Sequence, residues 1–141
     1  LKGVFHAFTG DISIAGKAVG MGFKLGIGGI VTFKNSGLDS VVKEIGLENI
    51  ILETDSPYLA PAPFRGKRNE SSYLKLINNK VAEILNIDPE KSAEVTYSNS
   101  SELFNQPFNI KGNYRAPMVC RYPGDYRRGT VQQYSWWHTF S

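Results

Sequence analysis

The sequence of 141 residues predicts an α/β fold with a parallel sheet, because apolar strand-forming segments alternate with helical ones. The strand-forming runs are short and rich in Val, Ile, Leu and Phe, whereas apolar residues of the other segments recur every three or four positions. Consecutive parallel strands need crossover connections, which helices normally provide. The predicted strands are 2–6, 24–31 and 49–54, and the predicted helices are 12–19, 38–46, 72–85 and 88–104.

Three such units occupy residues 1–104. A (β/α)8 barrel of about 250 residues uses about 31 residues for each of its units. Residues 1–104 are therefore expected to form part of a TIM-type barrel, with about three of its βα units. An open sheet of three strands has exposed edges, so we also expect self-association through these strand edges.

Local signals support the individual elements. The first strand passes through the loop Thr9-Gly10-Asp11 into a segment whose apolar residues fit one helix face. Gly46 is expected to end the second helix, because glycine readily adopts the backbone conformation found at helix C-termini. Asp88 followed by Pro89 is typical of an N-cap and a first-turn proline, and predicts the start of the last helix.

Residues 105–141 differ in composition from the rest of the chain. They carry 5 Lys+Arg against 1 Asp+Glu and 8 of the 17 aromatic residues, whereas residues 1–104 carry 11 Lys+Arg and 12 Asp+Glu. No helical or strand period is sustained, so we expect an irregular, basic and aromatic-rich tail. Such a tail can bind single-stranded nucleic acid by stacking and phosphate contacts. The alternatives are a disordered appendage or a sequence that does not belong to the fold of the body.

The composition excludes several classes of protein. No window approaches the roughly 18 consecutive apolar residues of a membrane-spanning helix, and the N-terminus lacks a signal-peptide pattern. Cys120 is the single cysteine, which excludes a disulfide scaffold and a zinc finger. We expect no membrane partner and a cytoplasmic location, with the nucleus as an alternative.

His6 and Asp55 are the first candidate functional residues. They follow the first and third predicted strands, at the ends where α/β folds place their reactive groups. An imidazole and a carboxylate at this edge can act as metal ligands, as a base, or as both. The alternative is a packed or surface histidine and an aspartate that caps a loop.

The glycines at 26, 28 and 29 do not predict a dinucleotide-binding loop. Such a loop lies between a strand and a helix, whereas these glycines are expected to lie within the second strand. Small residues that allow tight barrel packing explain them better.

Five segments together resemble the TatD family of metal-dependent deoxyribonucleases. The resemblance runs in family order through residues 3–104 and implies the C-terminal part of a (β/α)8 metal-dependent hydrolase barrel, from its sixth strand onward. The segments are GVFHAFTGD at 3–11, GIVTFKN at 29–35, ETDSPYLAP at 53–61, RGKRNE at 65–70 and NSSELF at 99–104.

The resemblance implies a phosphodiesterase with a divalent metal, Mg, Mn or Zn, and DNA as its substrate. His6 and Asp55 match metal ligands of the family, and Asp55 would also take the proton from the attacking water. Glu53, two residues earlier, would orient a ligand or pair with a cation of the barrel. The basic loop, defined as Arg65, Lys67 and Arg68, would grip DNA phosphates, or would be a solvated charged loop.

The family places its other metal ligands upstream of these segments, and residues 1–141 do not contain them. A metal centre needs about three or four protein ligands, and the resemblance assigns two here. The sequence therefore predicts a truncated form of the enzyme, without activity as an isolated chain. Two alternatives stay open: a non-catalytic fragment that binds nucleic acid or another partner, and a related barrel metallohydrolase that acts on a small amide or ester.

Overall fold

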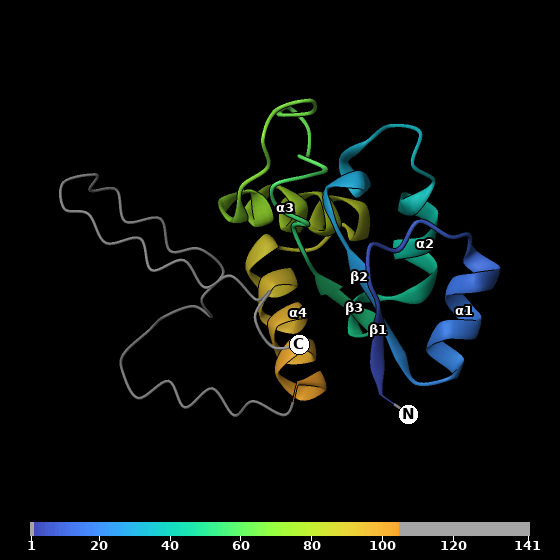
Figure 1. Cartoon of the computed structure of the whole chain (residues 1–141). Helices are drawn as coiled ribbons and strands as arrows, with labels where there is room; N and C mark the ends of the chain where they lie inside the picture. The colour runs from blue at the N-terminus through green and yellow to red at the C-terminus, as the bar shows by residue number, and fades with distance from the viewer. Residues whose placement is uncertain (1, 105–141) are drawn as a thin grey trace, which may run out of the picture.

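A computed structural model describes residues 2–104, which form one parallel sheet and an adjoining row of helices (Figure 1). The strands lie in the order β1, β2, β3, with Phe5 beside Leu25 and Leu25 beside Ile50. The strands are β1 (Gly3–Phe5), β2 (Phe23–Ile27) and β3 (Ile50–Leu52), and the helices are α1 (Ile12–Gly20), α2 (Leu38–Ile45), α3 (Leu74–Leu85) and α4 (Pro89–Leu103). Three short 3-10 helices are η1 (Gly29–Thr32), η2 (Leu47–Asn49) and η3 (Ser71–Tyr73).

The core lies between the sheet and the helices. Helix α1 contacts α2, α2 contacts α3, and α3 contacts α4, so the helices follow the strands in sequence order. This is the arrangement expected of consecutive βα units, in which each crossover helix covers the sheet that it connects. Fully buried side chains from the sheet, from α2 and from α3 meet in this layer, among them Leu25, Ile27, Ile50, Val42, Ile77 and Val81.

The predicted helix ends at Gly46 and Asp88 are confirmed, and Asp11 provides a further cap. Asp11 accepts a hydrogen bond from the backbone N–H of Ile14 and caps α1. Gly46 ends α2 with a positive φ of 78°, a conformation that glycine adopts without strain. The Asp88 carboxylate accepts from the N–H of Glu90 at the start of α4.

The second and third strands are shorter than the sequence predicts. The predicted strand 24–31 ends at Ile27 and turns into η1, and the predicted strand 49–54 is reduced to β3. Gly28 and Gly29 therefore follow β2 and do not lie within it. The reason is a close approach of backbones: a side chain on Gly29 would overlap the carbonyl oxygen of Leu59. The third predicted helix begins later, at Leu74, after η3.

Other predictions concern parts of the chain or properties that the structure leaves untested. Within residues 2–104, no helix is both long enough and apolar enough to cross a membrane. The predicted irregular tail, 105–141, lies outside the described residues. Self-association through the strand edges stays a prediction.

Candidate metal centre

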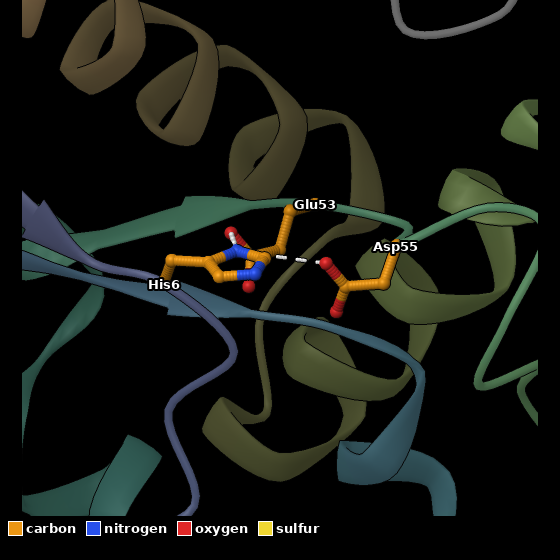
Figure 2. Close-up of side chains that lie close together, drawn as sticks. All are labelled: His6, Glu53 and Asp55. Carbon is orange, nitrogen blue, oxygen red and sulfur yellow. Dashed lines mark hydrogen bonds and ion pairs between the residues drawn. The ribbon is translucent and has the colours of Figure 1, made fainter. Parts of the chain in front are cut away.

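His6, Glu53 and Asp55 come together at the carboxyl edge of the sheet, and we call them the acidic triad (Figure 2). His6 directly follows β1, while Glu53 and Asp55 follow β3. The Nδ1 atom of His6 lies 3.2 Å from Oε2 of Glu53 and 3.5 Å from Oδ1 of Asp55. The expected juxtaposition of His6 and Asp55 is therefore present, and Glu53 takes part in it.

Glycines of the central strand make room for the acidic triad. Strand β2 separates β1 from β3, so groups that meet from the two outer strands must pass over it. A side chain on Gly26 would overlap the carboxylate of Glu53, and a Cβ on Gly28 would lie 3.1 Å from Oδ2 of Asp55. The close packing predicted for these glycines is thus present, and the groups that pack against Gly26 and Gly28 are the two carboxylates.

The backbone also shapes the site. Ala7 has φ of 48° and Asp55 has φ of 55°, in the left-handed region that residues with a side chain rarely adopt. The N–H of Ala7 donates to Oε1 of Glu53. The turn after β1 therefore holds the Glu53 carboxylate by its backbone while presenting His6 to the other oxygen.

The surroundings of the triad differ from one side chain to the next. The side chain of His6 is 59% exposed, and those of Glu53 and Asp55 are 17% and 14% exposed. The hydrogen bond to Glu53 raises the pKa of His6, against a smaller opposing effect of burial. Burial raises the pKa of Glu53, although the Ala7 N–H and His6 favour its charged form.

The acidic triad fits a divalent cation. One ligand atom from each of the three residues lies within 4.8 Å of the others. An imidazole nitrogen with carboxylate oxygens is a donor set that suits Zn2+ and Mn2+, and carboxylates also bind Mg2+. The TatD resemblance predicts His6 and Asp55 as ligands, and Glu53 as a residue that orients a ligand or pairs with a cation of the barrel. The geometry adds that Glu53 can itself contribute a ligand atom.

The basic loop lies in the segment between β3 and α3. Arg65, Lys67 and Arg68 are all exposed. The guanidinium carbon of Arg65 lies 4.5 Å from the centre of the Phe33 ring, a cation-π contact with the segment that follows η1. No hydrogen bond or ion pair among residues 2–104 joins the basic loop to the acidic triad.

One residue of the site escaped the sequence analysis. Asn69 directly follows Arg68, and it is 2% exposed although it lies in a polar loop. Its side-chain amide donates to the carbonyl oxygens of Thr54 and Tyr58, on either side of Asp55. Asn69 lies in the segment RGKRNE that supports the TatD resemblance, but a polar residue in a charged loop does not by itself predict burial, so this role was missed.

Comparisons with known proteins show the family of this chain. Residues 1–105 match the model of a family described as TatD related DNase. The chain belongs to this family. The TatD resemblance drawn from the five sequence segments is therefore confirmed.

Two curated relatives from the comparisons are described as uncharacterized metal-dependent hydrolases. YabD of Bacillus subtilis is 45% identical over 103 residues, which are 72% of this chain and 40% of YabD. A hydrolase of Buchnera aphidicola from Acyrthosiphon pisum, BU355, is 45% identical over 105 residues, or 74% of this chain and 40% of BU355. The chain thus spans about 40% of the length of these TatD relatives.

Solved structures confirm the fold class. The crystal structure of YjjV, a TatD homologue from Escherichia coli K12, matches with a TM-score of 0.70 and 29% identity. The match covers 74% of this chain and 41% of YjjV. Residues 2–104 therefore correspond to part of a TatD-type barrel of metal-dependent hydrolases, with about three of its βα units.

Proposed function

We propose that this chain supplies His6 and Asp55 as metal ligands to the active site of a divalent-metal-dependent deoxyribonuclease. The observation that carries the proposal is the approach of the His6 ring to Asp55 and Glu53, at 3.5 Å and 3.2 Å. These side chains leave the ends of two strands that are separated by a third, as in the active sites of (β/α)8 enzymes. Membership of the family supports the same function.

Each residue of the triad has its own role in the proposal. Glu53 lies beside Nδ1 of His6, which favours the tautomer with a proton at Nδ1 and leaves Nε2 free for a metal. Asp55 is the carboxylate ligand, and its Oδ2 atom, beside Gly28, takes the proton from the attacking water. A bound divalent ion would make that water more acidic and offset the charge on the phosphate oxygens.

The basic loop supports DNA as the substrate. Its three cationic side chains are exposed in the segment that begins at Asp55, and Arg65 is stacked on Phe33. Guanidinium groups form paired, charge-assisted hydrogen bonds with phosphates. A small neutral amide or ester would gain little from three exposed positive charges in the loop that follows Asp55, so we favour a polyanionic substrate.

The experiment uses a chimera in which the relative YabD supplies the rest of the barrel. In the barrel chimera, the stretch of this chain that aligns with YabD over 103 residues replaces the corresponding segment of YabD. We expect hydrolysis of DNA that requires Mg2+ or Mn2+ and stops when the metal is chelated. Asp55→Ala should lower kcat by roughly 10²–10⁴, the usual contribution of a positioned proton acceptor. Glu44→Ala, which removes an exposed carboxylate from α2, is the matched control and should leave kcat unchanged.

Two outcomes would contradict the proposal. A fully active Asp55→Ala chimera would remove Asp55 from the active site. Cleavage of small amides or esters without cleavage of DNA would keep a metal-dependent hydrolase and overturn the deoxyribonuclease.

A further inference from the structure

Asn69 makes more hydrogen bonds than a loop residue usually does. Its Nδ2 donates to the carbonyl oxygen of Thr54 and, at 2.6 Å, to that of Tyr58. Its backbone N–H donates to the carbonyl oxygen of Pro57 at 3.0 Å. Its Oδ1 accepts from the N–H of Glu70 at 2.8 Å. The buried amide is thus satisfied on both its donor and its acceptor side.

The three carbonyl groups held by Asn69 all belong to the segment 54–58, which contains Asp55. That segment is turned back on itself, since the N–H of Tyr58 donates to the carbonyl oxygen of Asp55 at 2.8 Å. Within the turn, Asp55 has a positive φ of 55°. Such a conformation costs on the order of 1 kcal/mol or more, and persists only where neighbouring contacts enforce it. Besides the hydrogen bond from Tyr58 within the turn, the contacts that hold this segment come from Asn69, on both sides of Asp55.

We propose that Asn69 is a positioning residue, which holds the carboxylate of Asp55 where it can bind the metal. The inference rests on the proposed function of Asp55 and adds a residue that does not touch the metal. Its side chain fixes the carbonyl before Asp55 and a carbonyl three residues after it. Without these bonds, Asp55 is free to relax to negative φ, which turns its carboxylate away from His6.

Asn99 provides a matched control within the same fold. It is also buried, and its Nδ2 also donates to two backbone carbonyls, of Leu47 at 2.9 Å and Ile50 at 2.7 Å. These bonds tie α4 to the start of β3, whereas Asn69 acts beyond the end of β3. In barrels of this type, the amino ends of the strands serve stability and the carboxyl ends serve function.

The experiment compares Asn69→Ala with Asn99→Ala, in the full chain and in parallel in the barrel chimera. Calorimetric titration with MnCl2 measures metal affinity, and unfolding in urea measures stability. Both variants should be less stable, because each loses two hydrogen bonds from the side-chain amide to backbone carbonyls. Only Asn69→Ala should also bind Mn2+ more weakly, by roughly 10- to 100-fold, as when a residue that orients a metal ligand is lost.

A second variant, Asn69→Asp, provides the test if Asn69→Ala does not fold. It keeps the shape of the side chain and the acceptor for Glu70, but it removes the donors to Thr54 and Tyr58. The added negative charge would by itself attract a cation. Weaker Mn2+ binding by this variant therefore reports the geometry of the loop and not its charge.

The outcomes separate this inference from the proposed function. Unchanged Mn2+ affinity in both Asn69 variants overturns the inference, and so does an equal loss in Asn99→Ala. Asp55→Ala tests the site itself: if it retains the wild-type affinity, the proposed metal site is wrong. If Asp55→Ala loses Mn2+ while the Asn69 variants keep it, the metal site stands and only the role of Asn69 falls.

Discussion

The proton on His6 determines whether its ring can bind a metal, because only the neutral imidazole is a ligand. The carboxylate of Glu53 accepts from Nδ1 at 3.2 Å, while the backbone of Ala7 holds the other carboxylate oxygen. Glu53 therefore has two effects on His6. It orients the ring and favours one tautomer, and it raises the pKa of His6. A metal ion at the site competes with the second proton of the ring.

The first prediction at this scale concerns that pKa in the metal-free chain. We expect NMR titration to place the pKa of His6 above its ordinary value of 6.5, and Glu53→Gln to lower it, because the variant removes the negative partner. His6→Gln assigns the signal, since His138 is the one other histidine. Glu44→Gln, at an exposed position of α2, should have no effect. A pKa that stays the same or rises in Glu53→Gln would contradict this role of Glu53.

The raised pKa values of His6 and Glu53 determine whether the stability of the chain rises or falls with pH. The pKa values of both His6 and Glu53 are raised on folding, so the folded metal-free chain holds more protons than the unfolded chain. Their contribution is fully present at low pH and is lost as pH rises from the ordinary value of Glu53, 4.5, through the raised pKa of His6. The free energy of unfolding in urea should therefore fall less steeply with pH in Glu53→Gln than in the wild type.

The order of the helices and strands, which depends on local sequence patterns, was predicted correctly. The apolar runs located all three strands, and Gly46 and Asp88 marked helix ends, because caps act within a few residues. The early end of β2 was missed, because it depends on the contact of Gly29 with Leu59, which lies far along the chain. Long-range contacts of this kind leave no local pattern.

In the candidate site, too, local features were predictable and long-range contacts were not. That His6 and Asp55 lie close together was predictable from their place after the strands, at the same edge of the sheet. Asn69 was not, because its burial depends on the turn that it closes around Asp55. The space that Gly26 leaves for Glu53 was predictable only as close packing, since the identity of the neighbour depends on the register of the sheet.

A prediction at this scale concerns the basic loop. In the barrel chimera, Lys67→Ala and Arg68→Ala should each weaken binding of single-stranded DNA and lower the slope of log K against log salt by about 0.7, since each removes one phosphate contact. Lys43→Ala, an exposed lysine on α2, is the control and should leave the slope unchanged. Equal slopes in all four proteins would show that the basic loop is a solvated surface.

For the molecule as a whole, the decisive fact is that residues 2–104 provide one sector of a larger architecture. The sheet of three strands and its row of helices match YjjV over 41% of that protein. Across this sector, the carboxyl edge carries the acidic triad, and the opposite edge carries the contact of Asn99 with β3. In (β/α)8 enzymes the carboxyl edge carries the active site and the amino edge serves stability, and the proposed metal site and the Asn99 contact fit this division.

The most direct test of the central claim is an anomalous diffraction map from crystals of the barrel chimera grown with Zn2+. We predict a metal peak about 2.0–2.2 Å from a ring nitrogen of His6 and from a carboxylate oxygen of Asp55. The same map from Asp55→Ala should show this peak weakened or lost. A metal peak with neither His6 nor Asp55 among its ligands would contradict the claim that this chain contributes to the metal centre.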